Sequence, residues 1–389
     1  MIIKSILDCD VYKFYMQDFV YSLYPTAVVK YQFICRNKDV KLGFLKDKVE
    51  NEIYSLDDLR FQEGEIEYLR SQKVFHENYL SWLEKDFKLK TRENIVIYEK
   101  DGDLKIDIVG RWCEVILFEI YILAIVNELY FRQRHDFSYK VGQENLNEKI
   151  RLLNENPDLK LIEFGTRRRF SREWQDQYVV KWLKEKCNNL IGTSNVFLAK
   201  KYNIPVIGSQ AHEIFSAHLS LVDNIAYAQK QTLYMWMAHF DNNTSLDLGI
   251  ALTDTFTTQA FFSDFKHSAA IAYKGVRHDS GDPFEFGEKV IKHYESMGIN
   301  PKEKFIVFSD GLNIPKSIKI HNYFGDRIKV KVFGVGTDLS NDLGCKALNI
   351  VIKLIECNGK PCVKISDNPS KAIGDAEMIK RVKIAYNIL

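Results

Sequence analysis

The chain has 389 residues, 46% of them hydrophobic and 13% aromatic, which is enough for two domains and a large core. Its 54 lysines and arginines nearly balance 52 aspartates and glutamates, so bulk charge gives no case for a nucleic-acid or membrane-surface protein. Only 8 prolines, 20 glycines and no low-complexity tract argue against a disordered or fibrous chain.

The longest apolar run covers residues 115–126 and is interrupted by Glu119. A membrane span needs roughly 20 apolar residues, so we expect a buried helix here. The first ten residues carry Asp8 and Asp10 where a signal peptide would stay apolar, which favours a cytoplasmic protein. Seven scattered cysteines without a C-x-x-C pair indicate reduced thiols rather than a zinc or dithiol site.

The first 110 residues mix strand and helix patterns. Residues 27–34 alternate as a strand does, and residues 94–98 and 104–109 flank an Asp-Gly turn typical of a hairpin. Residues 44–90 are rich in Glu, Lys and Leu and predict helices. After residue 346, the runs 348–355 and 362–365 flank an Asn-Gly turn, which predicts a second hairpin against the N-terminal sheet or the rim of a barrel.

From residue 111 onward, short apolar runs recur, each ending in a small or polar cluster, with helical stretches between them. The runs are 159–164, 190–191, 204–207, 248–253, 270–276, 305–308 and 330–333. This order predicts the strand–loop–helix units of a parallel α/β barrel. We therefore expect an N-terminal α/β domain at 1–110, joined by the tail at about 346–389, and a catalytic barrel at 111–345.

The polar clusters sit where the predicted strands end, which is where barrel enzymes place their active sites. Any one cluster could equally be a turn or a helix cap, but seven together favour a site. Residues 165–169 (Gly-Thr-Arg-Arg-Arg) suit carboxylate or phosphate binding, unless they are a solvated basic helix start. Phe164 just before them is either core or a stacking face for a flat ring.

Residues 277–283 (Arg-His-Asp-Ser-Gly-Asp-Pro) combine an arginine with two carboxylates. Asp279 and Asp282 suit Mg²⁺ held through water or the hydroxyls of a sugar, and the alternative is a capping turn before a helix at 283–293. The glycine loops at 308–313 and 333–337 could cradle phosphates with backbone N–H groups, although each is weak alone.

His212 lies at a predicted strand end beside Glu213. Most single histidines are structural, but arginine, aspartate and phosphate-type loops at the other strand ends favour an acid/base or phosphate-accepting role. Together the clusters imply an anionic, phosphorylated substrate with a sugar and Mg²⁺. The sequence has no Walker A motif, G-x-S-x-G, zinc spacing or G-x-G-x-x-G.

These motifs resemble the bacterial-type nicotinate phosphoribosyltransferase family over nearly the whole chain. The strongest stretches are residues 8–16, 163–172, 208–213, 277–283, 308–312 and 333–337. The resemblance implies an irregular (β/α) barrel of the type II phosphoribosyltransferase kind with an N-terminal α/β domain, in a homodimer with shared active sites. It also implies synthesis of nicotinate mononucleotide and pyrophosphate from nicotinate and phosphoribosyl pyrophosphate (PRPP) in NAD biosynthesis, coupled to ATP through a phosphohistidine.

The resemblance assigns roles to individual residues. Tyr12 corresponds to an aromatic that covers the nicotinate ring from the other subunit, and Phe164 to the opposite stacking face. Arg167 and Arg277 correspond to the charged groups near the carboxylate and the phosphates. The family implies Mg²⁺ carried by substrate phosphates, near Asp279 and Asp282, with no direct protein ligand.

Residues 208–213 correspond to a loop of the family that we call the histidine loop. In it, Ser209 corresponds to a ligand-contacting position and His212 to the phosphorylated one. Asp279 matches an acid near the ribose and pyrophosphate. The residues that match the ribose 5-phosphate cradle are Asp310, Gly311, Gly336 and Thr337.

Two positions of this chain differ from the residues usual in the family or in its nicotinamide-using relatives. The family more often has Gly-Thr where this chain has Gly-Ser at 208–209, and serine keeps the hydroxyl. Related nicotinamide enzymes have an aspartate where this chain has Ser194, so an acid that would repel a carboxylate is missing, which favours nicotinate. The alternatives are a nicotinamide- or quinolinate-using relative, or a barrel that binds a phosphorylated metabolite without turnover.

Overall fold

The computed structural model describes residues 1–240, 248–368 and 372–388. The chain divides into two compact units. Unit 1 comprises Met1–Asp158, Ile162–Ile207 and Val335–Lys353, and unit 2 comprises Leu159–Leu161, Gly208–Gly334 and Leu354–Leu389. These units are defined by contacts, and the domain boundaries expected near residues 110 and 345 stay a prediction.

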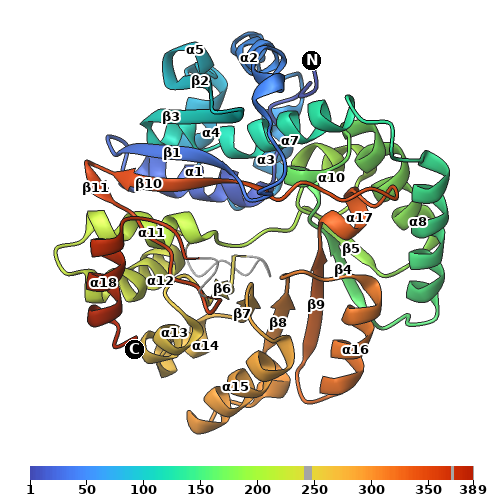
Figure 1. Ribbon diagram of the computed structural model, residues 1–389. Coiled ribbons are helices and arrows are strands. Elements are labelled where there is room, and N and C mark those ends of the chain that lie inside the picture. Colours follow the sequence, from blue (N-terminus) through green and yellow to red (C-terminus); the bar gives the residue numbers. More distant parts are fainter. Residues whose placement is uncertain (241–247, 369–371, 389) are drawn as a thin grey trace. The chain divides into compact units, whose positions relative to one another are not determined.

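Unit 1 contains a mostly antiparallel sheet whose strands follow the order β10-β1-β3-β2 (Figure 1). Their bounds are β1 Val28–Cys35, β2 Ile95–Lys100, β3 Asp103–Arg111 and β10 Ile350–Cys357. The predicted hairpin is confirmed, because β2 and β3 pair antiparallel around Asp101 (φ 54°) and Gly102 (φ 78°). Positive φ at both turn positions is what a two-residue hairpin turn requires. The first half of the predicted tail hairpin, β10, joins this sheet beside β1.

The helices of unit 1 include three within the predicted helical region 44–90. All 14 residues of α7 are buried, which confirms a buried helix in the apolar run. The bounds are α1 Val11–Leu23, α2 Lys46–Tyr54, α3 Glu65–Ser71, α4 Glu77–Lys85, α5 Thr91–Asn94, α6 Trp112–Val115, α7 Phe118–Phe131, α8 Tyr139–Asn154, α9 Lys181–Lys186, α10 Val196–Tyr202 and α17 Thr337–Ser340. Shorter turns are η1 Gly43–Leu45, η2 Ser55–Asp58, η3 Thr166–Arg168 and the π-helical η4 Trp174–Val180.

Unit 2 contains parallel strands in the order β9-β8-β7-β6. Their bounds are β6 Ile250–Leu252, β7 Gly275–His278, β8 Phe305–Phe308 and β9 Val330–Val335, whose last residue is counted in unit 1. Gly275 has a packing role, because a Cβ there would overlap the carbonyl oxygen of Phe305 on the neighbouring strand. Short parallel strands with helices between them confirm the expected texture of this part of the chain.

The helices of unit 2 separate and follow these strands, and α15 matches the helix predicted at 283–293. Their bounds are α11 His212–Leu221, α12 Ala228–His239, α13 Thr258–Asp264, α14 His267–Ala272, α15 Pro283–Ser296, α16 Ile314–Phe324 and α18 Ala376–Ala385, with short turns η5 Ile225–Tyr227 and η6 Pro301–Glu303. Two further predicted runs form strands: 159–164 contains β4, Lys160–Glu163, and 190–191 begins β5, Leu190–Thr193.

Three predicted strands are wrong in whole or part, each for a local reason. Residues 204–207 form only a one-residue bridge between Val206 and Thr193, since Pro205 has no N–H to donate. Residues 270–276 begin in α14, whose alanines favour a helix, and the strand starts only at Gly275. The second strand of the tail hairpin is β11, Lys360–Pro361, which ends at its proline instead of covering 362–365.

Among the described residues, no helix is long and apolar enough to cross a membrane. All seven cysteines are free thiols, as the sequence predicts.

Candidate active site

The carboxyl ends of the parallel strands in unit 2 bring together five charged or ionisable side chains, which we call the histidine cluster. They are His212, Asp254, Arg277, Asp279 and Lys364. His212 begins α11, Asp254 follows β6, Arg277 lies on β7 and Asp279 follows it, while Lys364 comes from the segment after β11. Asp254, Arg277 and Asp279 lie at or just after strand ends, as the sequence predicts, whereas His212 begins α11 after a run that forms only a one-residue bridge. The cluster unites three sequence-predicted residues with two that were not assigned a role.

His212 lies at the centre of the cluster, and its side chain is 15% exposed. Its Nε2 is 2.8 Å from Asp279 Oδ2, 2.7 Å from Lys364 Nζ and 3.5 Å from Asp254 Oδ1. On the other side of the ring, Nδ1 is 3.2 Å from the hydroxyl of Thr255. Burial, with the nearby Lys364 ammonium in second place, lowers the pKa of His212 to about 4. The imidazole is therefore neutral at physiological pH, which is the form that can act as a nucleophile.

Both carboxylates stay ionised, although Asp254 is buried and the Asp279 side chain is only 28% exposed. Burial raises the pKa of Asp254, but the Lys364 ammonium outweighs it, so the pKa lies below its usual value. The pKa of Asp279 is held well below its usual range, because the hydrogen bond from His212 and the charge of Arg277 outweigh burial. A hydroxyl also donates to each of them, Ser280 to Asp254 at 2.6 Å and Ser309 to Asp279 at 2.9 Å.

Arg277 connects the cluster to the histidine loop. Its Nη1 donates to the hydroxyl of Ser209 at 2.7 Å, and its Nη2 is 4.0 Å from Asp279 Oδ2. Its buried Nε has no hydrogen-bond partner in the described part of the chain. A buried, unpartnered guanidinium N–H is costly, and at Arg277 it leaves a charged donor unused beside His212 and Asp279.

The loop after β8 lies next to this cluster through Ser309, whose hydroxyl donates to Asp279 at 2.9 Å. Asp310 is half-buried, and Gly311 has φ +56° with open space where a Cβ would be. Asp282, in contrast, caps helix α15 by accepting the N–H groups of Phe284 and Glu285, both at 2.9 Å. The capping alternative thus accounts for Asp282.

The side chains of His212, Asp254 and Asp279 lie close enough for their donor atoms to face one metal ion. The Lys364 ammonium lies 3.2 Å from Asp254 and 2.7 Å from His212 Nε2, within that group. Mg²⁺ requires an octahedron of oxygen ligands. A nitrogen ligand and an ammonium in the same space do not fit a directly bound Mg²⁺.

In unit 1, the three arginines at 167–169 face different surroundings. Arg169 is fully buried, whereas Arg167 is 42% exposed, with its guanidinium 3.9 Å from Asp10 and 3.6 Å from Glu119. Arg168 makes a 3.5 Å contact with Asn349. Three arginines adjacent in sequence are therefore not one anion site. Arg167 and Arg168 are both partly exposed, whereas Arg169 is buried.

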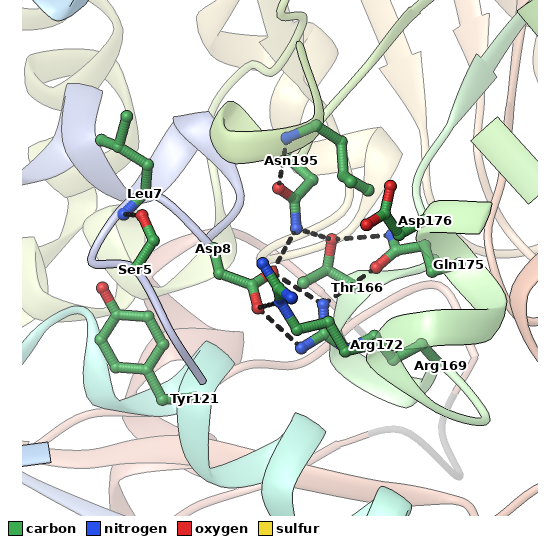
Figure 2. Close-up of polar contacts among 12 residues, drawn as sticks. Ser5, Leu7, Asp8, Tyr121, Thr166, Arg169, Arg172, Gln175, Asp176 and Asn195 are labelled. Carbon is green, nitrogen blue, oxygen red and sulfur yellow. Dashed lines mark hydrogen bonds and ion pairs between the residues drawn. The ribbon is translucent and has the colours of Figure 1, made fainter. Parts of the chain in front are cut away.

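Arg169 belongs to a buried cluster around Asp8, shown in Figure 2 and called here the aspartate cluster: Asp8, Arg169, Arg172, Gln175 and Asn195. Arg169 donates to both oxygens of Asp8, at 2.7 and 2.8 Å, and Arg172 Nε donates to Asp8 at 3.2 Å. Asn195 donates a further bond at 2.8 Å. Burial raises the pKa of Asp8, but the two arginines outweigh it and keep the pKa below its usual value.

Ser194 lies beside an acid that the sequence analysis did not consider. Its hydroxyl donates to Asp10 Oδ1 at 2.7 Å, and both side chains are buried. Burial raises the pKa of Asp10, and Arg167 acts against that rise. The sequence analysis expected no acid at residue 194, and Ser194 indeed is not one. A carboxylate is nevertheless present beside it, on Asp10.

The remaining predicted residues of unit 1 lie in its loops and helix starts. Tyr12, in the first turn of α1, is 9% exposed, and burial raises its pKa well above the usual value. The N–H of Phe164 donates to Val335 O at 2.9 Å, and a Cβ at Gly336 would come within 3.0 Å of Phe164 O. Gly336 therefore permits close backbone approach, and Thr337 begins α17 directly after it.

Sequence reasoning missed Asp254, Lys364, Asp10 and Glu119. Asp254 directly follows a predicted strand, so the strand-end rule could have found it. Glu119 was visible as the acid inside an apolar run. Lys364 had no sequence signal, because its role depends on where the C-terminal segment folds back.

Solved structures match the whole chain closely. A nicotinate phosphoribosyltransferase from Vibrio cholerae has a TM-score of 0.93 and 36% identity, covering 100% of this chain and 95% of that one. The Porphyromonas gingivalis structure has a TM-score of 0.93 and 35% identity, covering 100% of both chains. The predicted fold class is confirmed: the protein is an α/β enzyme of the type II phosphoribosyltransferase fold with an N-terminal α/β domain.

Sequence comparisons identify the family. The family model of nicotinate phosphoribosyltransferases (NAPRTases) matches residues 159–388, and that of their N-terminal domain matches residues 7–127. Nicotinate phosphoribosyltransferases from Yersinia enterocolitica and Yersinia pseudotuberculosis are 41% and 42% identical, covering 96% and 99% of this chain and 92% and 96% of their own lengths. The chain belongs to the nicotinate phosphoribosyltransferase family and is an enzyme of that type.

Proposed function

We propose that this enzyme makes nicotinate mononucleotide and pyrophosphate from nicotinate and PRPP in NAD biosynthesis, and that ATP drives the reaction through a phosphohistidine at His212. One observation carries the ATP-coupled part. His212 is a neutral imidazole held by Asp279 at 2.8 Å, with a serine-bound arginine, Arg277, 4.0 Å from that same carboxylate. A neutral, oriented imidazole next to cations is what attack on a phosphate requires.

The phosphoryl step balances as follows. The ring nitrogen that carries the lone pair attacks the γ-phosphorus of ATP and forms an N–P bond, while the bond from that phosphorus to the bridging β-γ oxygen breaks. The electron pair leaves with ADP, and the ring proton stays on the other nitrogen. When Nε2 carries that proton, Asp279 accepts it in a hydrogen bond and stabilises the charge that develops on the ring.

The synthetic step itself does not need His212, since the ring nitrogen of nicotinate attacks the ribose C1 and pyrophosphate leaves. The phosphoryl group adds charge near −2 and several acceptor oxygens. In our proposal it attracts Arg277, whose Nε has no partner among the described residues, and so favours the closed form of the enzyme. Mg²⁺ enters with the substrate phosphates, because the donor set does not fit a directly bound ion.

For the base, we propose that Arg167 attracts the carboxylate of nicotinate. Arg167 is 42% exposed, and its guanidinium carries a positive charge beside Asp10 at 3.9 Å and Glu119 at 3.6 Å. Phe164 supplies one stacking face, and Tyr12 the other from the partner subunit of a homodimer. The ribose 5-phosphate would be held by Asp310, Gly311, Gly336 and Thr337. These roles, and a cytoplasmic location, stay predictions.

The reaction is tested by measuring pyrophosphate release with nicotinate, nicotinamide and quinolinate in parallel, each with and without ATP. The proposal expects release with nicotinate, stimulated by ATP, and much less with the other two. Equal kcat/KM for nicotinate and nicotinamide would contradict the assignment of Arg167.

The shared site is tested by subunit exchange. Mixing Tyr12→Ala with Asp279→Ala protein should restore some activity, because one site of each hybrid dimer has both residues intact. Absence of recovery in proven hybrids would place Tyr12 in the site of its own subunit or outside any site.

A further inference from the structure

Lys364 directs a positive charge at the ring of His212 from a segment distant in sequence. Its Nζ is 2.7 Å from His212 Nε2 and 3.2 Å from Asp254 Oδ2, and its side chain is only 10% exposed. Lysine side chains are rarely buried without a specific partner. A lysine on the surface would need no explanation, but a lysine buried to this extent does.

The backbone around Lys364 fixes the ammonium in place. Lys364 and Ile373 exchange two N–H to carbonyl bonds of 3.0 Å, and the N–H of Ile365 donates to Thr255 O at 2.9 Å. The hydroxyl of Ser366 donates to Asp254 at 3.2 Å. The segment is thus bound to the loop that also carries Asp254, and the contact with His212 is part of the folded structure of unit 2.

The chemistry of the contact favours one protonation state of the histidine. An ammonium has hydrogen atoms to donate and no lone pair, so it bonds to Nε2 only when that nitrogen carries its lone pair. The proton of the neutral ring is then on Nδ1, which faces the hydroxyl of Thr255 at 3.2 Å. Any state with a proton on Nε2, whether the other neutral tautomer or the doubly protonated ring, would direct an N–H at the ammonium from 2.7 Å.

The charge balance of the cluster leads to the same conclusion. The charged groups facing His212 are Asp254 and Asp279, which are negative, and Lys364, which is positive; Arg277 adds a second positive charge beside Asp279. With a neutral imidazole these four charges cancel. Without Lys364, two carboxylates would face one arginine, and a proton on His212 would restore neutrality.

We propose that Lys364 is a functional residue that keeps His212 neutral, and hence nucleophilic, between two carboxylates. Lys364 acts through His212 and so is a positioning residue. The inference rests on the proposed function only for its consequence in catalysis. The lowered pKa of His212, due first to burial and then to Lys364, agrees with it.

The direct test is a titration of the histidine Cε1 signals by NMR, with the His212 signal identified by its loss in His212→Asn. In the wild type we expect a midpoint well below the usual value of about 6.5. In Lys364→Met the midpoint should rise by about one unit or more, so that at a given pH the neutral-to-protonated ratio falls at least about tenfold. Lys364→Arg keeps a cation and should restore most of the low midpoint.

The matched control is Lys360→Met, which removes an exposed lysine of β11 in the same segment and should leave the midpoint unchanged. Circular dichroism and thermal melting establish that each variant is folded. An unchanged His212 midpoint in folded Lys364→Met overturns the proposal. If that variant does not fold, the wild type still decides, because a midpoint at or above the usual value also overturns it.

The consequence for catalysis is measured separately, as acid-labile ³²P incorporated from γ-labelled ATP. Between about pH 8 and about pH 5, incorporation should fall about twofold in Lys364→Met, if its His212 midpoint has risen to about 5, and hardly at all in the wild type. Wild-type protein that takes up no ³²P would refute the phosphohistidine, while the NMR titration would still decide the role of Lys364.

Discussion

The histidine cluster of unit 2 and the aspartate cluster of unit 1 are both groups of charged side chains next to strand ends. They differ in how those side chains are paired. In the aspartate cluster, the carboxylate of Asp8 accepts bonds from Arg169, Arg172 and Asn195. In the histidine cluster, His212 is neutral and its Nε2 lies between a carboxylate and an ammonium. Each cluster has one buried arginine Nε without a partner among the described residues, Arg169 in the first and Arg277 in the second. The difference is that two arginines bind the carboxylate of the aspartate cluster, which stabilises a loop, whereas the histidine cluster contains a neutral imidazole that can react.

The largest expected effect tests whether the aspartate cluster stabilises the fold. Asp8→Asn should remove one charge from a buried pair and leave Arg169 uncompensated, which costs about 3–5 kcal/mol of unfolding free energy. Chemical denaturation measures the loss, with Asp39→Asn, a substitution of an exposed acid, as the control. Wild-type stability in Asp8→Asn would show that the aspartate cluster does not hold the fold.

The next effect separates Arg167 from its neighbour Arg168. Arg167→Met should lower kcat/KM for nicotinate by roughly 10- to 150-fold, since one charge-assisted hydrogen bond is worth roughly 1.5–3 kcal/mol. Stability should change little, because Arg167 is 42% exposed. Arg168→Met is the matched control and should change kcat/KM far less. Equal losses in both variants would contradict the assignment of the base carboxylate to Arg167.

A third prediction compares two histidines of the same helix, α11. Burial lowers the pKa of His218 to about 4, as it does for His212, and the Nδ1 of His218 is 2.7 Å from the Ile214 carbonyl oxygen. Because the unfolded chain binds protons below about pH 6.5 that the folded chain does not, stability should fall as pH drops toward 4. At about pH 5 we expect each histidine to cost about 2 kcal/mol.

Denaturation at about pH 7.5 and about pH 5 measures this loss in the wild type and in His218→Asn. The variant should lose about 2 kcal/mol less than the wild type between the two pH values. A wild-type stability that does not change over this range would contradict the low pKa values.

The smallest effect concerns the acid beside Ser194. Ser194→Asp would place a second carboxylate next to Asp10 and should move the preference from nicotinate toward nicotinamide by about tenfold. Asp10→Asn should act in the opposite direction. The ratio of kcat/KM for the two bases checks both, and an unchanged ratio in Ser194→Asp would show that this pair does not face the base.

Much of this could be predicted from sequence because parallel strands bring their carboxyl ends together. That rule identified His212, Arg277 and Asp279 before any contact was known. It could not distinguish Arg167 from Arg169, since both follow the same strand and only tertiary packing buries one of them against Asp8. Nor could it find Lys364, whose contact with His212 depends on a C-terminal segment that folds back after Pro361 ends β11.

The central claim is that ATP phosphorylates His212, and the most direct measurement is incorporation of acid-labile ³²P from γ-labelled ATP. We expect label on the wild type and on His218→Asn, and none on His212→Asn, which should keep slow, ATP-independent synthesis of nicotinate mononucleotide. A stable His212→Asn protein whose activity is still stimulated by ATP would contradict the account.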